Sequence, residues 1–316
     1  GKAHAPTQPL LSSAMQFPCV ALLSLLGPTS AALRDHFPNI LPFPGHASRG
    51  AFSDRGAWHG FALPDPDTAG GFAGPFIHGT WGPGDHWLSR ECLVRFVPEV
   101  MQNSSQLPPA ALKFDFLPGL LVQSYRLGAL RVHSKLAFVG RHVAGAHVVM
   151  ANTGPDPVDI HLAFNGSATV PLMLNGSAVL AANFSAKAAQ AVAAVHLPTG
   201  LEIQVAGHQF TGKGTAPQRL EPSAKLETYY AVSLALNSSE HLTARHEADV
   251  FLGKPEQHFA ANAQRWEQYL RVVGRIEPSG PSLRQRVAAK AVSTLALNWR
   301  GATGTALLHD GLTPSI

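Results

Sequence analysis

Apolar and polar residues alternate with a period of two over most of the middle of the chain. In segment 130–136, Leu130 and Val132 alternate with polar residues, as in a strand with one solvated face. Segment 120–127 reads as an adjoining strand, and Gly128-Ala129 between the two predicts a hairpin turn. Further strands are predicted at 142–152, 158–164, 201–205 and 228–236. Many short strands separated by turn residues indicate an antiparallel β-sandwich.

Near residue 253 the pattern changes to the spacing of an α-helix. Pro255 suits a first helical turn, and apolar residues follow at helical spacing: Phe259, Trp266, Tyr269 and Leu270. After a linker at 274–281, a second helix is predicted with this apolar face: Val287, Ala288, Ala291, Val292, Leu295 and Trp299. We expect Trp266 and Trp299 to be core residues. Because such a face must be covered, we expect a further domain or a partner protein over helices 255–300.

The composition supports a folded protein that does not bind nucleic acid. Of the 316 residues 45% are apolar and only 14% charged, which excludes extended disorder. The 29 Gly and 25 Pro residues suit a turn-rich β protein. The net charge of +4 is small, and the basic residues are scattered, so nothing would follow a phosphate backbone.

Metal and cofactor chemistry find no support in the sequence. Two cysteines, Cys19 and Cys92, can form neither a disulfide framework nor a cysteine-based metal site. The 16 His residues include no HxxxH or HxH pair near a carboxylate, so we expect them to lie on the surface and in loops. We predict no metal and no cofactor.

The N-terminal region predicts entry into the secretory pathway. Segment 15–31 has an apolar stretch, a Gly27-Pro28 break and small residues at 29–31, the layout of a signal peptide. Its apolar part is too short to be a transmembrane helix. Five N-x-[ST] acceptor sequences agree with a glycoprotein of the endoplasmic reticulum lumen or the extracellular space: Asn103, Asn165, Asn175, Asn183 and Asn237. An ordinary apolar N-terminal segment in a cytosolic protein is the alternative.

Three segments carry a family resemblance. They are 54–64 (DRGAWHGFALP, followed by GGFAG at 70–74), 264–270 (QRWEQYL), and 288–300 (AAKAVSTLALNWR, continuing into HDGLTPS at 309–315). In this order and spacing they resemble glycoside hydrolase family 63, in particular its bacterial-type α-glucosidases. The GAWHG and NWR…HDG blocks are specific as a pair, whereas either alone would be weak.

The resemblance implies an N-terminal β-sandwich packed on an (α/α)6 barrel that cleaves terminal α-linked glucose from oligosaccharides with inversion. Inversion needs two carboxylic acids, and in the family both lie on the barrel, past the end of this sequence. We therefore assign no catalytic residue and expect the chain alone to be inactive. The predicted organisation is an N-terminal segment (1–50), a sandwich (51–252), and linker helices that begin the barrel (253–316). A stand-alone sandwich that binds carbohydrate or protein is the alternative function.

Four residues are candidates for a substrate rim or an interdomain contact. Trp58 and His59 could face a sugar, but Gly56 and Gly60 beside these rings favour a tight packing turn. His309 and Asp310 lie on a loop that the resemblance directs toward the active-site face, and a solvated turn is their alternative. Asp65, Asp67, Glu91, Glu99 and Asp115 show no spacing that selects a catalytic pair.

Overall fold

The computed structural model describes residues 32–41, 51–77, 86–89, 91–101, 108–176, 178–182 and 191–301. The predicted signal segment, two of the acceptor asparagines (Asn103 and Asn183), and the pair His309 and Asp310 lie outside these residues. Within them, no helix has the length and apolar character needed to cross a membrane.

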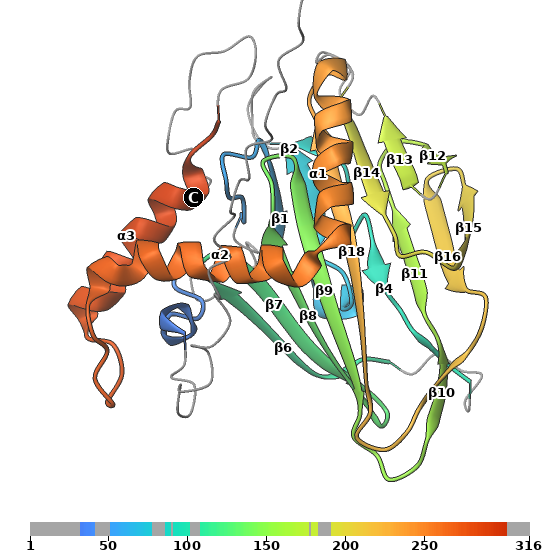
Figure 1. Ribbon diagram of the computed structural model, residues 1–316, viewed down its shortest axis with the longest axis horizontal. Helices are drawn as coiled ribbons and strands as arrows, with labels where there is room; N and C mark the ends of the chain where they lie inside the picture. Colours follow the sequence, from blue (N-terminus) through green and yellow to red (C-terminus); the bar gives the residue numbers. More distant parts are fainter. Residues whose placement is uncertain are drawn as a thin grey trace, which may run out of the picture. The chain divides into compact units, whose positions relative to one another are not determined.

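The largest element is an antiparallel sheet of eight strands (Figure 1). In spatial order its strands are β12 (Leu172–Asn175), β13 (Ala178–Ala182), β14 (Val192–His196), β18 (Lys225–Ala235), β9 (Val143–Asn152), β8 (Leu130–Phe138), β7 (Leu120–Leu127) and β6 (Ala110–Leu117). The β7–β8 hairpin pairs Leu127 with Leu130, as the Gly128-Ala129 turn predicts. Consecutive strands therefore form a meander at one side of the sheet, and later strands extend its other side.

Three smaller antiparallel sheets complete the β structure. One contains β15 (Leu201–Ala206), β16 (Gln209–Gly214), β11 (Ala163–Ser167) and β4 (Arg95–Phe96). The second contains β17 (Gln218–Leu220), β10 (Val158–His161) and β5 (Glu99–Val100), and the third β1 (His59–Ala62), β2 (Ala73–Ile77) and β3 (His86–Trp87). The predicted strand 158–164 is thus divided between two sheets at Leu162.

Aliphatic and aromatic side chains fill the space between the eight-stranded sheet and the smaller sheets. Phe96 and Phe164 meet edge to face at 5.3 Å between ring centroids, and Phe164 meets Tyr230 of β18 at 5.9 Å. These contacts join β4 and β11 to the large sheet. All three side chains are buried, so their apolar surface supplies much of the driving force for packing the two layers.

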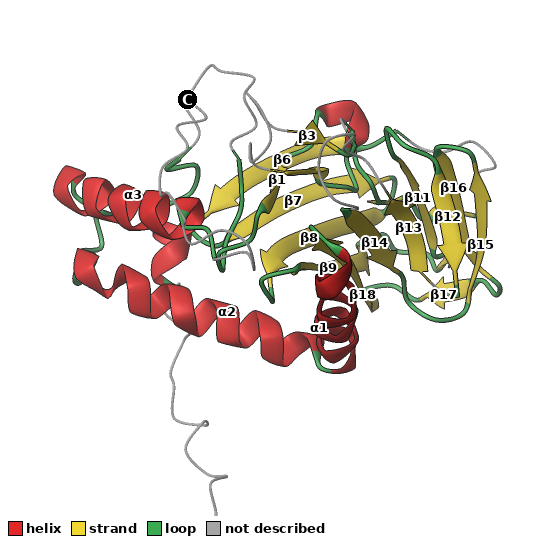
Figure 2. Ribbon diagram, turned by 90° about the horizontal axis from the view of Figure 1, so that it is seen from above, coloured by secondary structure: helices red, strands yellow, loops and turns green. Residues whose placement is uncertain are grey.

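Helices α1 (His241–Gly253) and α2 (Pro255–Leu270) cover part of the opposite, outer face of the large sheet (Figure 2). The third helix, α3 (Leu283–Asn298), packs against α2 and the 3-10 turn η4 (Arg271–Val273). The other 3-10 turns are η1 (Leu33–His36), η2 (Pro66–Thr68) and η3 (Ser238–Glu240). Phe251 of α1 packs with Val143 and Ala231, and Phe259 of α2 packs against Val122. Both contacts use the alternate strand positions that do not face the aromatic core.

The fold class expected from the sequence is confirmed: a mainly β sandwich followed by helices. Helix α1 was not predicted, because its narrow buried stripe of Ala244, Ala248 and Phe251 follows directly on the apolar strand β18. Trp266 is fully buried, as expected, but the prediction that Trp299 is a core residue is wrong, since 52% of its surface is exposed. Trp299 lies just after α3 in extended backbone and has left the helical face.

We expect Phe164→Ala to destabilise the protein strongly, because it removes the ring that joins two sheets and leaves a cavity. Substitutions of this kind cost roughly 3–5 kcal/mol. Urea unfolding of the two proteins measures the difference. Val250→Ala, at an exposed position of α1, is the control and should change stability by about 0.5 kcal/mol or less. Equal effects of the two substitutions would contradict this description of the core.

Candidate functional site

The described parts of the segments 54–64, 264–270 and 288–300 meet in one place, which we call the junction. Its residues are Asp54, Trp58, Arg141, Arg265, Trp266 and Gly301. More than 200 residues separate Asp54 from Arg265 in the chain, as they do Trp58 from Gly301. The first segment forms the turn before β1 and β1 itself, and the second lies in α2. The third forms the greater part of α3 and the two residues that follow it. The junction therefore ties the sandwich to both later helices.

The centre of the junction is the buried carboxylate of Asp54. One oxygen accepts hydrogen bonds from the Arg55 backbone N–H (2.7 Å) and from Nη1 of Arg265 (2.9 Å). The other accepts from Nη2 of Arg265 and from the indole N–H of Trp266 (3.0 Å). Asp54 is 1% exposed and the Arg265 side chain 19%. A desolvated carboxylate needs such complete pairing, and here the bidentate guanidinium supplies half of it.

Arg265 is positioned from several sides. Its Nη2 also donates to Oδ1 of Asn262 (2.7 Å), and Asn262 in turn donates to the carbonyl of Gly119 (2.9 Å) in the β6–β7 turn. Burial by itself lowers the pKa of Arg265, but its hydrogen bonds with Asp54 raise the pKa above the ordinary value. The guanidinium is therefore charged, and the contact with Asp54 is an ion pair.

Glycines allow the elements of the junction to approach closely. Gly56 has φ +74°, and a side chain there would collide with the Trp299 ring and the Gly301 backbone. Gly119 has φ +73° and lies against the Trp266 indole, where a Cβ would overlap the ring. Both positions need glycine for conformation and for space.

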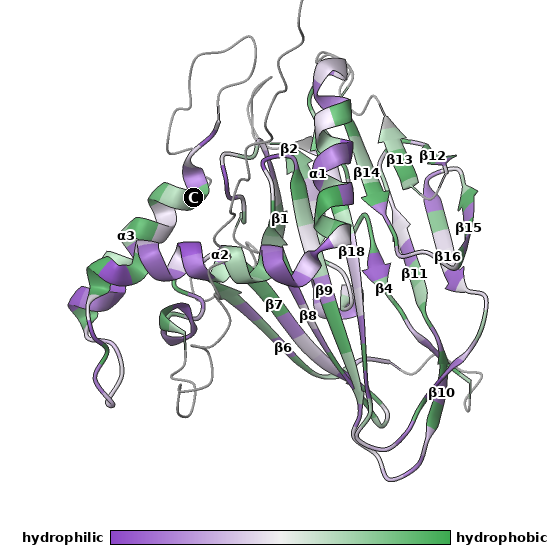
Figure 3. Cartoon of the chain, in the orientation of Figure 1, coloured by the Kyte–Doolittle hydropathy of each residue, from purple (hydrophilic) through white to green (hydrophobic). Residues whose placement is uncertain are grey.

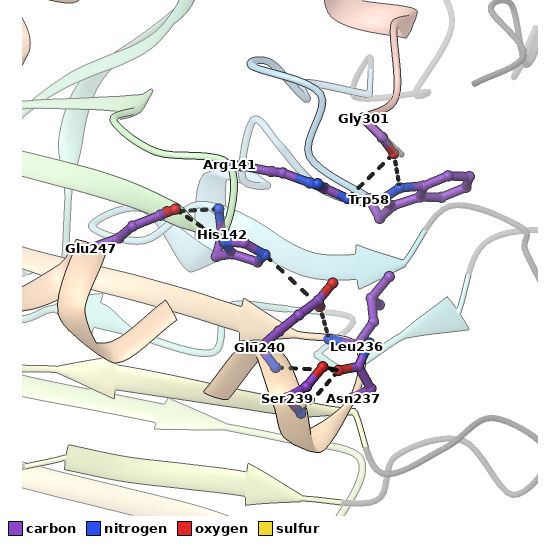
Figure 4. Close-up of polar contacts among 9 residues, drawn as sticks. All are labelled: Trp58, Arg141, His142, Leu236, Asn237, Ser239, Glu240, Glu247 and Gly301. Atoms are coloured by element: carbon purple, nitrogen blue, oxygen red, sulfur yellow. Dashed lines mark hydrogen bonds and ion pairs between the residues drawn. The ribbon is translucent and has the colours of Figure 1, made fainter. Parts of the chain in front are cut away.

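A second set of contacts holds the chain just after α3. The carbonyl of Gly301 accepts from the indole N–H of Trp58 (2.7 Å) and from Arg141 (3.3 Å), as Figure 4 shows. The N–H of Gly301 donates to the carbonyl of Gly56 (2.8 Å). The GAWHG turn thus binds both polar groups of the Gly301 backbone, and it orients the chain where it leaves the helix.

His59, next to Trp58, is 1% exposed and packs edge-on against Phe138 (5.0 Å) and Phe61 (6.0 Å). Together with Trp58, Arg141, His142 and Glu240 it lines a cavity of only about 10 Å³. Such a cavity holds at most one water. In the described structure, Trp58 and His59 therefore contact protein groups, and their role toward a sugar stays a prediction.

A tie between sheet and helix lies beside this cavity (Figure 4). Nδ1 of His142 lies 3.1 Å from Glu247 of α1, and Nε2 lies 3.9 Å from Glu240. Glu247 also accepts from the His142 backbone N–H (2.9 Å). Burial by itself lowers the pKa of His142. Its interactions with the two carboxylates outweigh this effect and raise the pKa to about 9. The pKa values of Glu240 and Glu247 are lowered in return. At neutral pH this cluster is an imidazolium between two carboxylates.

A cleft of about 750 Å³ opens beside the junction, and we call it the junction cleft. Its polar lining includes Asp54, Arg55 and Arg265, and its apolar side includes Tyr269, Leu295 and Trp299. Asp54 is the one carboxylate among the described lining residues, and its oxygens are already bonded. Because inverting hydrolysis needs a general acid and a general base, the cleft is not assigned catalysis.

Apolar and polar residues alternate along α3, whose ribbon is part green and part purple in Figure 3. Val287 is 60% exposed and Leu295 64% exposed, whereas the buried residues of this helix are Ala289, Ser293 and Leu297. The face predicted from the sequence to need a cover is therefore not the face that packs on the described part of the chain.

Two of the five carboxylates considered from the sequence form ion pairs with lysines. Glu99 forms an ion pair with Lys213 (2.6 Å) and Asp115 one with Lys113 (2.9 Å). No group of three or more His, Cys, Asp or Glu side chains suited to a metal ion occurs among the described residues. Asp54 and Arg265 lie in the segments 54–64 and 264–270, but neither was predicted from the sequence to be a site residue. No local signal in the sequence marks them, because both segments contain other charged and polar residues.

No family model matches the chain. Its fold is similar to that of a protein described as a kojibiose phosphorylase from the human microbiome, with a TM-score of 0.52 and 9% identity. It is also similar to a family GH92 alpha-mannosidase from Bacteroides thetaiotaomicron, with a TM-score of 0.50 and 12% identity. The alignments cover 79% and 86% of this chain but only 39% and 42% of those proteins. The chain thus has a β-sandwich-and-helix fold found in carbohydrate-active enzymes, and it spans about two fifths of their length.

We expect Asp54→Asn to destabilise the protein by about 3–5 kcal/mol, because it leaves the Arg265 guanidinium buried without its counter-charge. Urea unfolding measures this. The double variant Asp54→Leu/Arg265→Met should recover part of the loss, since neither charge then remains. Asp159→Asn breaks the exposed pair with Arg219 (3.5 Å) and should cost about 1 kcal/mol or less. A similar small loss for Asp54→Asn would contradict the central role of this pair.

The His142 cluster predicts a fall in stability on the alkaline side. Its folded-state pKa of about 9 exceeds the unfolded value of about 6.5, so its contribution is complete below pH 6.5 and disappears as the pH rises through 9. The lowered pKa values of Glu240 and Glu247 act on the acidic side, where their contribution disappears as the pH falls below about 4.5.

Unfolding free energies measured from pH 5 to pH 10 test this tie. Between pH 6.5 and 9.5 the wild-type protein should lose on the order of 2 kcal/mol through His142, and His142→Gln should remove this part of the slope. Glu247→Gln is the matched variant and should reduce the slope as well. An unchanged slope in His142→Gln would show that another group causes the loss.

Proposed function

We propose that this chain is the N-terminal, non-catalytic portion of an inverting α-glucosidase-like hydrolase of glycoside hydrolase family 63. The observation that carries the proposal is the junction, because the described parts of the three segments that resemble this family contact one another there. Segments that merely resembled a family by chance would have no reason to meet. The fold similarity to two carbohydrate-active enzymes supports the more general statement that the chain is part of a carbohydrate-active enzyme.

The uncovered surfaces of the helices support a following domain. Tyr269, Leu295 and Trp299 form an apolar wall on the junction cleft, and Val287 extends it along α3. Large exposed apolar surfaces usually mark contacts. We assign this wall to an (α/α)6 catalytic domain of the same polypeptide, since the similar enzymes are more than twice as long as the aligned part.

This arrangement indicates different roles for the sandwich, the helices and the proposed barrel. The sandwich, predicted over 51–252, holds the helices at the junction, and the helices and the chain after Gly301 lead into the barrel. The helical part begins at His241 with α1, earlier than the boundary at 253 predicted from the sequence. The barrel would bind the oligosaccharide and carry both catalytic acids, so this chain alone would be inactive. Cleavage of terminal α-linked glucose is the activity that the resemblance implies.

The secretory pathway remains the proposed location. Of the acceptor asparagines in the described residues, Asn175 lies exposed at the end of β12, and Asn165 lies within β11 between two neighbouring strands. Asn237 caps η3 with its side-chain oxygen, which accepts from the N–H groups of Ser239 and Glu240. Signal segment 15–31 and the lumenal or extracellular location are supported by the sequence pattern alone.

The native polypeptide and its activity test the proposed function. An antibody against this chain should detect a protein whose mass after glycan removal far exceeds 33.5 kDa. That protein should release glucose from α-linked glucosides, with the β-anomer appearing first in NMR spectra, whereas residues 1–316 alone should release none. A deglycosylated mass near 33.5 kDa would refute the proposal and favour the stand-alone carbohydrate- or protein-binding sandwich.

Trp299 offers a sharper test of domain contact. In residues 1–316 alone, Trp299→Ser should change stability little, because half of the side chain is exposed. In the full-length protein the same substitution should cost about 3–5 kcal/mol, since the side chain would be packed against the barrel. Val250→Ser on α1 is the control and should behave alike in both proteins. No difference between the two contexts for Trp299 would place the barrel elsewhere.

A further inference from the structure

A second concave surface, which we call the outer trough, lies on the outer face of the large sheet beside α1. It has a volume of about 390 Å³. Small side chains make its floor, namely Ala178, Ala194 and Ala235, from β13, β14 and β18. Residues of α1 form one wall. The trough exists because α1 covers only the β18–β9 side of this face, and alanine replaces larger residues beyond it.

The strand register places Asn175 on the same face. Asn175 pairs directly with Ala178, and Ala178 pairs with His196, so the three side chains form one row across the sheet. Directly paired residues point to the same side. Asn175 is exposed and is itself a lining residue of the outer trough.

The walls combine apolar and polar groups. Leu180 and Leu242 supply apolar surface, and Leu242 is 81% exposed. On the polar side, Nε2 of His196 lies 2.9 Å from the Ser233 hydroxyl. Arg245 and Asp249 of α1 line the same wall, with 3.9 Å between their charged groups. Burial lowers the pKa of His196, so its ring is neutral at neutral pH and can donate as well as accept.

We propose that the outer trough holds the first sugars of an N-linked glycan attached to Asn175. The inference rests on the proposed secretory location. An N-acetylhexosamine has an apolar ring face and methyl group beside hydroxyl and amide groups, which matches alanine and leucine surface next to His196, Ser233, Arg245 and Asp249. The occupant is tethered at the rim, so it needs little intrinsic affinity to remain in place.

The attachment balances chemically. The side-chain nitrogen of Asn175 forms a bond to C1 of the first sugar of a lipid diphosphate-linked oligosaccharide. The bond between that carbon and the diphosphate breaks, and the amide releases one proton. No electrons are gained or lost overall. Gly176, with φ +61°, and the sequence Asn175-Gly176-Ser177 put the acceptor at the tip of the β12–β13 hairpin.

The test measures how fast an amidase that cleaves the Asn–glycan bond releases each glycan from the full-length protein made in a secretory host. Mass spectrometry of the peptides follows each site. If the outer trough holds the sugars, release at Asn175 should be about tenfold slower from the native than from the denatured protein, equivalent to about 1.4 kcal/mol of protection. Leu242→Gln should speed native release at Asn175 without changing its occupancy. Val250→Ser, on α1 but not among the lining residues, should leave it slow.

The possible outcomes distinguish a failure of this inference from a failure of the proposed secretory location. If no acceptor asparagine carries a glycan, the secretory proposal fails and the inference with it. If other sites are occupied and Asn175 is not, the location stands and the inference is refuted. Equal release rates from native and denatured protein at an occupied Asn175 also refute the inference while the location stands. Slow release that Leu242→Gln does not change would place the sugars outside the outer trough, which overturns the inference as well.

Discussion

The ion pair between Asp54 and Arg265 is the interaction on which the arrangement of the helices depends. It joins a turn of the sandwich to α2 inside an apolar environment, where an unpaired charge would be costly. Since Asp54 also accepts from the Trp266 indole, one carboxylate fixes both the rotation and the position of α2. Helix α3 follows from this, because Leu297 packs in the same core cluster as Trp266.

Apolar packing and the polar contacts contribute differently to the junction. Apolar burial is non-directional and would allow α2 to slide along the outer face of the sheet. The bidentate pair and the Asn262 hydrogen bond to Gly119 allow one register only. The contacts of Trp58 and Arg141 with Gly301 extend this specification to the point where the chain leaves α3. A domain that follows would therefore begin at a defined place and direction.

The two faces of the eight-stranded sheet are covered to different extents. Aliphatic and aromatic side chains fill the inner face, whereas the outer face carries a helix where it has Val143 and Ala231, and stays open over Ala178 and Ala194. The outer trough and the junction cleft are both consequences of helices that cover only part of an apolar surface. In our proposals, a glycan covers the first and a catalytic domain the second.

The sequence by itself determined five strands (at 120–127, 130–136, 142–152, 201–205 and 228–236), the β7–β8 hairpin, the α2 helix and the buried Trp266, because these depend on local periodicity and on turn residues. It also identified the three segments that meet at the junction. It could not separate α1 from the strand before it or place Trp299 outside the helical face, since both depend on what surrounds the segment. The Asp54–Arg265 pair and the row from Asn175 to His196 were decided only by the tertiary structure. They join residues that are far apart in the chain, and no local preference records which distant charge or strand becomes the neighbour.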